Sequence, residues 1–250
     1  MQDAQSAYPV CGDTFAKVFM DERGLQIFES FKAEKKANAS NLARARIIDD
    51  HLRRALAAHP DLLVVTVGAG FDTRPFRLPG GSWLELDEPQ IIAYKNQRLP
   101  VADSPNPLQR IAIDFSTGAL AEKLAPYARH RPVICVVEGV LLYLDPPARQ
   151  HLAYTLRSAF PAHTLICDLM TKKFLHSYAR SVRRRIADLG ASLTAADRPD
   201  QLFTAAGYRM QQVTSISRSA AAFGLLKVPL WMLRFMRTLS SGYAIYLFKA

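Results

Sequence analysis

Short apolar runs alternate with segments of helical periodicity along most of the chain. Five apolar, β-rich runs have the length of strands, at residues 62–67, 82–87, 109–113, 132–137 and 164–168. Segments with helical spacing follow several of them, and one begins at Asp145-Pro146, an N-cap followed by a first-turn proline. Strands that alternate with helices form βαβ units. The pattern therefore predicts an α/β fold in which helices cover both faces of a mostly parallel sheet.

The two ends of the chain depart from this rhythm. We expect residues 12–58 to be helical, with the strongest segment starting at Ser40 and stopping before Pro60. Three elements are expected after the fifth strand: an arginine-rich helix over 171–190 and two last strands over 208–214 and 243–249.

No repeat or low-complexity linker divides the chain, and 250 residues suffice for one α/β domain with a sizeable core. We therefore expect a single domain over 1–250. Its expected parts are a helical N-terminal cap over 1–60 and an α/β core over 61–250, with lid insertions near 171–200 and 219–240.

The net charge of +10 is the unusual feature of the composition. It suggests an acidic substrate, an anionic membrane surface or a nucleic acid as a partner. The basic residues are spread along the chain, with local clusters at 44–46, 172–173 and 180–185. A nucleic-acid footprint concentrates on one face, so we expect a solvated surface with mild steering and no nucleic-acid partner.

Cysteine and histidine usage gives no sign of a metal site. Cys11, Cys135 and Cys167 are too few and too far apart for a disulfide framework or a paired-cysteine site, and no histidine motif has metal-binding spacing. The first ten residues lack the regions of a signal peptide, and no apolar stretch is long enough to span a membrane. We expect a cytoplasmic protein without a metal.

The first strand runs directly into Gly68-Ala69-Gly70. Glycines at this point let the chain turn tightly and bring backbone close to a ligand. The second strand ends in Asp87, where a carboxylate can accept hydrogen bonds from both ribose hydroxyls of a nucleoside. The alternative is that Asp87 only caps the helix that begins at Glu88-Pro89. Together the two features predict a ligand that contains a nucleoside.

The residues after the glycines distinguish between two kinds of ligand. A dinucleotide-binding loop has a third glycine, which lets a helix pack closely beneath the pyrophosphate. Here that position holds Thr73, followed by Arg74-Pro75, and a proline so early obstructs such a helix start. The sequence therefore disfavours a nucleotide-dependent dehydrogenase and favours a ligand without phosphates.

Four segments occur in an order that matches one family. They are Val67-Gly68-Ala69-Gly70-Phe71-Asp72-Thr73-Arg74, then Glu85-Leu86-Asp87-Glu88-Pro89 with Lys95, then Ile113-Asp114-Phe115, and last Glu138-Gly139-Val140-Leu141-Leu142-Tyr143-Leu144. From about residue 12 to the end, the chain resembles the leucine carboxyl methyltransferase superfamily, especially its bacterial polyketide O-methyltransferases. The resemblance implies a Rossmann-like class I methyltransferase fold with a seven-stranded sheet whose last two strands form a hairpin. It also implies S-adenosylmethionine as the cofactor.

The resemblance further implies how the cofactor is held. Arg44 would pair with the cofactor's carboxylate, which suits a planar guanidinium, and Arg46 is the nearby alternative. The other residues implied are Gly68, Ala69 and Gly70 beneath the methionine part, Asp87 at the ribose, Asp114 and Phe115 at the adenine, and Glu138 at the ammonium. Either arginine could instead be a helix-surface charge, and Asp114 and Phe115 could be a helix N-cap and a core aromatic.

No catalytic base stands out. The six histidines are scattered at positions 51, 59, 130, 151, 163 and 176, and His176 alone follows the fifth strand near the expected acceptor side. Tyr143 could line the acceptor or simply pack. Arg74 could bridge to Asp72 or help hold an acidic acceptor. The catalytic residues stay unidentified, with His176, Tyr143 and Arg74 as weak candidates.

Oxygen is the expected acceptor atom. Methyltransferases of nucleobase amines often carry an Asn/Asp-Pro-Pro-aromatic motif at the end of the fourth strand. Here Asp145-Pro146-Pro147 is followed by Ala148 and lies well beyond that strand. The apolar and basic segment over 223–237 is expected to form a lid over a hydrophobic or acidic acceptor. Membrane-surface contact is not favoured, and a dimer interface or plain packing is a further alternative.

These features predict an S-adenosylmethionine-dependent O-methyltransferase. Its acceptor would be a hydroxyl or carboxyl group of a small, partly hydrophobic molecule such as a polyketide-type metabolite. Two alternatives stay open: a methyltransferase for protein C-terminal carboxyl groups, and a non-catalytic protein that binds S-adenosylmethionine. The sequence predicts no oligomeric state.

Overall fold

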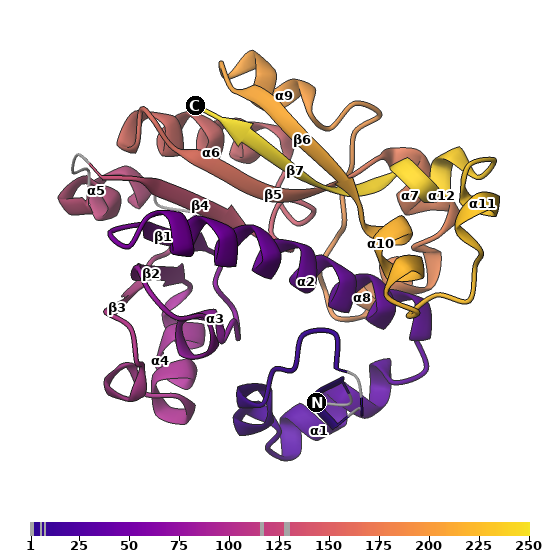
Figure 1. Cartoon of the computed structure of the whole chain (residues 1–250), viewed down its shortest axis with the longest axis horizontal. Coiled ribbons are helices and arrows are strands. Elements are labelled where there is room, and N and C mark those ends of the chain that lie inside the picture. Colours follow the sequence, from indigo (N-terminus) through magenta and orange to yellow (C-terminus); the bar gives the residue numbers. More distant parts are fainter. Residues whose placement is uncertain (1–2, 6, 8, 116–117, 128–130) are drawn as a thin grey trace.

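The computed structural model describes residues 3–5, 7, 9–115, 118–127 and 131–250. At its centre lies a seven-stranded sheet of order β3-β2-β1-β4-β5-β7-β6 (Figure 1). Strands β1 to β5 are parallel, and β7 pairs antiparallel with β5 and β6. The strands are β1 (Leu63–Val67), β2 (Ser82–Asp87), β3 (Leu108–Ala112), β4 (Val133–Val137), β5 (Thr164–Met170), β6 (Arg209–Ser215) and β7 (Tyr243–Lys249). The predicted seven-stranded, mostly parallel sheet is confirmed.

Helices connect and cover the strands. They are α1 (Glu22–Phe31), α2 (Lys35–Ala58), α3 (Arg74–Arg77), α4 (Pro89–Arg98), α5 (Leu120–Leu124), α6 (Pro146–Ala159), α7 (Lys172–Ser177), α8 (Arg180–Asp188), α9 (Gln201–Ala205), α10 (Ile216–Ala222), α11 (Leu230–Leu233) and α12 (Arg237–Ser241). As predicted, Asp145 caps α6, and its carboxylate accepts from the backbone N–H of Ala148 at 2.8 Å.

Two helix predictions need correction. The main N-terminal helix starts at Lys35 and not at Ser40. The Ser40 side chain does not act as an N-cap, because its hydroxyl donates to the carbonyl oxygen of Lys36 at 3.0 Å inside the helix. The single helix predicted over 171–190 is two helices, α7 and α8. Helix α7 buries two residues and α8 buries none, so the chain turns between them at the buried Ala179.

The sheet carries a separate hydrophobic core on each face. Alternate residues of β1 divide between them: Val64 packs with Leu52 of α2, whereas Val65 packs with Leu156 of α6. This alternation follows from the pleat of a strand whose two faces are both covered. Cys135 and Cys167, predicted as core residues, are fully buried on the α6 side.

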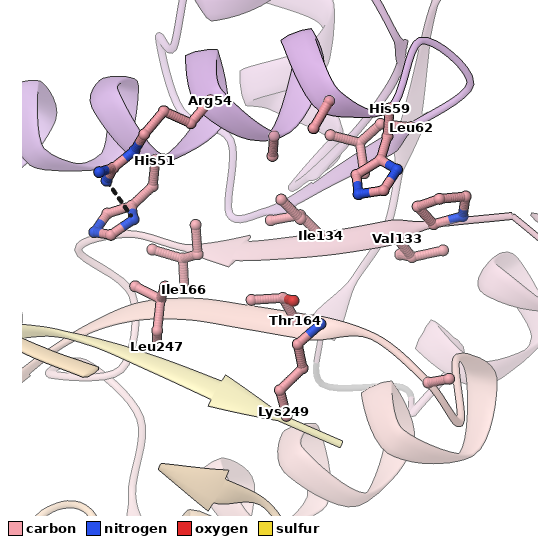
Figure 2. A pocket seen from close by; sticks show the side chains of 14 residues that line it. His51, Arg54, His59, Leu62, Val133, Ile134, Thr164, Ile166, Leu247 and Lys249 are labelled. Atoms are coloured by element: carbon pink, nitrogen blue, oxygen red, sulfur yellow. Dashed lines mark hydrogen bonds between the residues drawn. The ribbon is translucent and has the colours of Figure 1, made fainter. Parts of the chain in front are cut away.

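A groove lies at the amino ends of the parallel strands. It has a volume of about 530 Å³ and separates the second half of α2 from β4, β5 and β7 (Figure 2). Its floor includes Ile134 and Ile166, and His51, Arg54 and Lys249 line its sides. Ligands of open α/β sheets bind outside the carboxyl ends of the strands, so the expected cofactor position is the opposite edge of the sheet.

Candidate cofactor site

The glycine loop follows β1 at the carboxyl edge of the sheet. Gly68 has a φ of +69° and Gly70 a φ of +47°, a backbone region that favours glycine. A side chain on Gly68 would collide with Val140, because the loop lies close against the turn that follows β4. A Cβ on Gly70 would meet no atom within 4 Å, so this side of the loop is open.

Asp87 lies beside this loop, at the end of β2. Its Oδ2 accepts from the Gly70 N–H at 2.5 Å and its Oδ1 accepts from the Glu88 N–H at 2.7 Å. It makes no capping bond to α4, the alternative left open by the sequence. A carboxylate has about four acceptor positions, so two bonds fix its orientation and leave capacity for hydroxyl donors.

Arg44 reaches the same edge from α2. Its Nε donates to Oε1 of Glu138, the residue directly after β4, at 2.8 Å. Its Nη1 donates to the Tyr243 hydroxyl at 2.7 Å. That hydroxyl donates to Asp168 Oδ2 at 2.9 Å. Burial alone would lower the pKa of Arg44, but Tyr243, Asp168 and Glu138 raise that pKa well above its ordinary value. Arg44 is a fixed cation at the centre of the edge.

Gly139 completes the surroundings of Arg44. Its φ is +68°, and a Cβ there would lie 3.3 Å from Nη2 of the guanidinium. The Gly139 N–H donates to Asp168 Oδ1 at 2.6 Å, which ties the turn after β4 to β5. The backbone after β4 can therefore approach the arginine closely because it carries no side chain.

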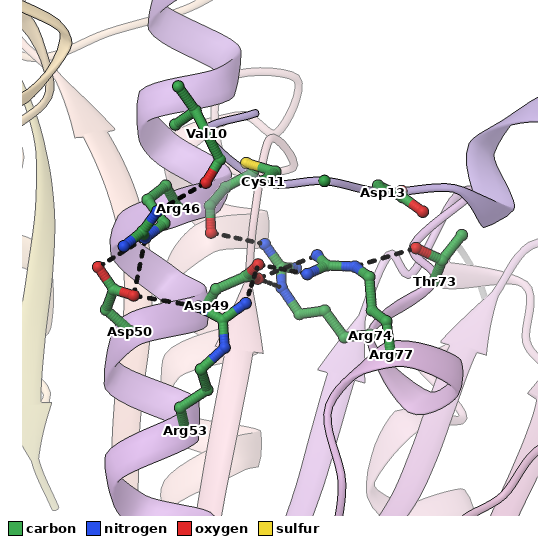
Figure 3. A network of polar contacts seen from close by, with 12 residues as sticks. Val10, Cys11, Asp13, Arg46, Asp49, Asp50, Arg53, Thr73, Arg74 and Arg77 are labelled. Carbon is green, nitrogen blue, oxygen red and sulfur yellow. Dashed lines mark hydrogen bonds and ion pairs between the residues drawn. The ribbon is translucent and has the colours of Figure 1, made fainter. Parts of the chain in front are cut away.

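Arg46 points away from this edge. Its Nε pairs with Asp50 at 2.9 Å and its Nη1 donates to the carbonyl oxygen of Val10 at 2.7 Å (Figure 3). Arg44 and Arg46 were alternatives for the cofactor's carboxylate. The structure brings Arg44, and not Arg46, to Glu138 and the strand ends.

Arg74 joins the glycine loop to α2 and β4. Its Nε lies 2.7 Å from Asp49 Oδ1, and its Nη1 lies 2.8 Å from Asp72 Oδ2 and 2.7 Å from Glu138 Oε2. Arg77 also binds Asp49, and Figure 3 shows both arginines converging on that carboxylate. Three carboxylates surround the guanidinium of Arg74, and its side chain is 3% exposed. These contacts favour a role for Arg74 as a bridge to Asp72 over contact with an acceptor.

Glu138 is held between two arginines. Burial would raise the pKa of Glu138, but Arg74 and Arg44 outweigh that effect and hold the pKa below its ordinary value. The group is therefore a carboxylate at neutral pH. A buried carboxylate is costly unless it is paired, and the two arginines provide that pairing.

Lys95 has a structural explanation. Its Nζ lies 2.8 Å from Glu85 Oε1, while Arg110 Nε lies 2.7 Å from Glu85 Oε2, and all three side chains are buried. This triad fastens α4 to β2 and β3, next to the strand end that carries Asp87. The lysine of the second motif therefore belongs to the frame of the site and not to its open side.

Asp114 and Phe115 follow β3, the next strand after β2 in the sheet. Asp114 is exposed and Phe115 is half-buried. The Phe115 N–H points to Glu88 Oε1 at 3.5 Å, so the segment lies near the end of β2. Both residues are thus on the side of the edge away from Arg44, at a position that a long ligand could reach.

Of the three weak catalytic candidates, Arg74 is buried and the other two are exposed: His176 lies on α7, and Tyr143 is 48% exposed in the turn after β4. Burial of its other half raises the pKa of Tyr143. His130 lies outside the described residues, and among those that are described no three His, Cys, Asp or Glu side chains gather as a metal site would require.

Three residues of this network were not singled out from the sequence. Asp49 stands inside the apolar face of α2, and Asp168 stands inside the buried strand β5, where an acid requires a partner. An acidic residue within an apolar pattern could have identified both aspartates from the sequence. Nothing in the sequence distinguishes Tyr243, because a tyrosine at the start of a strand is ordinary.

Comparison with known proteins identifies relatives of this chain. The profile of the leucine carboxyl methyltransferase family matches residues 1–157. A Mycolicibacterium gilvum protein that carries the name of an S-adenosyl-L-methionine-dependent methyltransferase is 29% identical over 205 residues, covering 78% of this chain and 66% of its own. The tetracenomycin polyketide synthesis O-methyltransferase TcmP of Streptomyces glaucescens is 28% identical over 145 residues, covering 57% and 51%. The chain thus spans about half to two thirds of the length of these relatives.

Solved structures of low identity share the fold. A DUF574 family protein from Streptomyces avermitilis aligns over 100% of this chain and 99% of its own, with a TM-score of 0.64 and 16% identity. A Thermobifida fusca crystal structure described as that of a methyltransferase covers 84% and 80%, with a TM-score of 0.58 and 15% identity. The predicted family and fold are confirmed, and the predicted cofactor agrees with the names of the curated relatives. Because the family profile covers more than half of its residues, this chain belongs to the leucine carboxyl methyltransferase family.

Proposed function

We propose that this protein transfers a methyl group from S-adenosylmethionine to an oxygen of a small, partly hydrophobic molecule. The observation that carries the proposal is the pairing of Arg44 with Glu138 beside the glycine loop, at the carboxyl ends of β1 and β4. Curated relatives named for S-adenosylmethionine support the cofactor, and the name of TcmP supports a polyketide-type acceptor.

The residues at this edge suit the parts of the cofactor. A guanidinium fits its carboxylate and a carboxylate fits its ammonium, as Arg44 and Glu138 provide. Arg44 and Glu138 already pair with each other. The carboxylate and ammonium of the cofactor would therefore add to an existing ion pair, and no buried charge would be left unpaired. The open side of Gly70 leaves room for the ligand, and Asp87 retains acceptor capacity for the ribose hydroxyls.

Binding and orientation are what the chain itself contributes. When bound, the cofactor supplies an electrophilic methyl group on a sulfonium. Tyr243 and Asp168 hold the Arg44 guanidinium in one place, so Arg44 can fix the carboxylate end of the ligand. Alignment of two reactants supplies on the order of 7–11 kcal/mol of barrier reduction in favourable cases. A carboxylate acceptor then needs no base.

An acceptor hydroxyl would have to lose a proton. Tyr143 is a poor base for this step because burial raises the pKa of its phenol, which keeps it protonated at neutral pH. It can instead donate a hydrogen bond to an acceptor oxygen. Acidic phenols and carboxylates are accordingly the acceptor classes that the site favours.

Calorimetric titration tests the cofactor assignment. S-adenosylmethionine and S-adenosylhomocysteine should bind saturably and NADH should not. Loss of a charged hydrogen-bond pair costs about 1.5–3 kcal/mol, so Arg44→Met should weaken binding about 10- to 150-fold. Arg46→Met is the matched control on the same helix and should leave the affinity unchanged. Equal losses in the two variants would refute the assignment of Arg44.

Methyl transfer from labelled cofactor tests the acceptor. Three sets of candidates are compared: phenolic polyketide-like compounds, small carboxylic acids, and a peptide that ends in a leucine carboxylate. Transfer to the peptide alone would establish the protein carboxyl alternative. Saturable cofactor binding without transfer to any set would favour the non-catalytic alternative, and a methylated nitrogen in the product would contradict the proposal.

A further inference from the structure

The net charge of the chain resides entirely in its last third. Residues 1–168 contain 19 Lys and Arg and 19 Asp and Glu, whereas residues 169–250, here called the basic region, contain 13 and 3. The last 50 residues contain no acid at all. Within the described part of the chain, Arg185 alone of these thirteen forms an ion pair, with Glu34 at 3.1 Å. The basic region therefore presents cations that its own fold does not neutralise.

The basic region also exposes large apolar side chains. Four of them, here called the apolar patch, lie on and after α11: Leu230 is 47% exposed, Trp231 65%, Met232 40% and Phe235 81%. Leu233, in their midst, is 0% exposed and anchors the segment to the body of the protein. The outward side chains are thus held out by a fixed short helix. Exposed apolar clusters of this kind mark contact sites for proteins or membranes.

Cations surround the apolar patch. Lys227, Arg234 and Arg237 flank it along the chain, and all three are exposed. Helices α7, α10, α11 and α12 gather at one end of the sheet, where α12 contacts both α11 and α7 (Figure 1). Helix α7 in turn contacts α8, whose Arg180 and Arg184 are exposed. The apolar patch therefore lies next to exposed cations, and α12 and α7 connect it to the exposed arginines of α8.

The segment over 223–237 was expected to form a lid, but four of its large apolar side chains face solvent. We therefore propose instead that the apolar patch and the cations around it form a docking surface for anionic lipid bilayers. Trp, Phe and Leu side chains enter the headgroup boundary while Lys and Arg attract anionic lipids. A bilayer requires charge of one sign only, which is what the basic region offers. A second copy of the chain would bring another charge of +10 toward it, so self-association is disfavoured.

Among the described residues no helix has the length and apolar character needed to cross a bilayer. The segment that carries the apolar patch ends at Tyr243, which bonds Arg44 in the candidate site. Docking would therefore bring the carboxyl edge of the sheet toward the membrane. If the proposed function holds, this geometry favours an amphipathic acceptor retained in the lipid, whereas docking itself does not depend on methyl transfer.

Vesicle sedimentation tests the docking surface. The full chain is mixed with vesicles of phosphatidylcholine, with or without phosphatidylglycerol, and should sediment only with the anionic ones. The chain has two tryptophans, and Trp83 is 2% exposed, so a blue shift of fluorescence on binding reports Trp231. The double variant Trp231→Ser/Phe235→Ser should reduce partitioning at least about tenfold. Arg180→Gln/Arg184→Gln should reduce it about 30-fold and flatten its dependence on salt.

A matched variant controls for exposed apolar side chains in general. Tyr154 is 47% and Met210 49% exposed elsewhere on the molecule, so Tyr154→Ser/Met210→Ser should bind vesicles like the wild type. All variants should retain wild-type affinity for S-adenosylhomocysteine, which verifies their fold. The proposal is overturned if the wild type ignores anionic vesicles or if Trp231→Ser/Phe235→Ser binds equally well. Sedimentation equilibrium that shows a dimer dissolved by that variant would instead make the patch an interface between copies.

Discussion

The neutral part of the chain and the basic region use arginine in opposite ways. In residues 1–168, Arg74 and Arg110 have side chains that are 3% and 1% exposed; three carboxylates lie 2.7–2.8 Å from Arg74, and Glu85 lies 2.7 Å from Arg110. In the basic region, Arg180 and Arg184 are exposed, without an ion pair among the described residues. A buried, paired guanidinium fixes the loops that frame a site, and its removal leaves charges uncompensated. An exposed excess cation contributes little to folding but acts on charged partners at a distance.

The largest expected difference concerns stability. Arg74→Leu removes the shared partner of Asp49, Asp72 and Glu138 and should lower the free energy of unfolding by about 3–5 kcal/mol. Arg184→Leu, in the basic region, should change it by less than about 0.5 kcal/mol. Urea denaturation at neutral pH measures both. Similar losses in the two variants would show that the two regions do not differ in this way.

A buried histidine should make the neutral part sensitive to acid. His163 is 1% exposed, with Nε2 3.1 Å from the Tyr208 hydroxyl, and burial lowers its pKa from 6.5 to about 4. Between these values the unfolded chain binds a proton that the folded chain does not. Stability should therefore fall as the pH drops from 6.5 toward 4, by about 3 kcal/mol in all.

Denaturation midpoints across this pH range check the expectation. His163→Gln should make stability fall less between pH 6.5 and 4 than it does in the wild type. The substitution also removes a buried contact and should lower stability at every pH. His176→Gln, at an exposed site on α7, should leave the decline as it is in the wild type. A wild type whose stability is flat between pH 6.5 and 4 would contradict the assignment.

The sheet was predictable because each strand carries its own signal, whereas the contacts of the site are long-range. Runs such as 63–67 are apolar on both faces, which already indicates a covered parallel strand. Arg44 could also have been preferred over Arg46 from the sequence. The apolar Ile47 and Ile48 follow Arg44 at three and four positions, which places it on the apolar face of the helix, whereas two aspartates follow Arg46 at the same spacing. The pairing of Arg44 with Tyr243 had no local signal, because it joins opposite ends of the chain through the sheet topology.

That long-range pairing predicts a smaller effect at the site. Tyr243→Phe removes the hydroxyl between Arg44 and Asp168 while leaving the ring in place. One hydrogen bond contributes about 0.5–1.5 kcal/mol, so affinity for S-adenosylmethionine should fall about two- to tenfold, less than for Arg44→Met. Tyr246→Phe, on the same strand, is the control. Calorimetric affinities that are equal for both variants would show that Arg44 keeps its position without Tyr243.

The smallest effect is expected where the two regions meet. Arg185 of α8 pairs with Glu34 at 3.1 Å, and the two side chains are 40% and 18% exposed. A double-mutant cycle with Arg185→Gln and Glu34→Gln should give a coupling below about 1 kcal/mol at low salt. It should vanish near 1 M salt, where the Debye length is about 3 Å.

A coupling above about 2 kcal/mol between Arg185 and Glu34 would contradict the contrast drawn between the neutral part of the chain and the basic region. The basic region would then be fastened to the N-terminal helices by charge, as the glycine loop is fastened to α2 by Arg74. A weak coupling leaves α8 joined to the rest of the protein through its packing and through hydrogen bonds such as that of the Ser181 hydroxyl to Glu34 at 3.0 Å. Its arginines then remain available to an outside anion, which is the condition under which the excess charge of this region can act on a membrane.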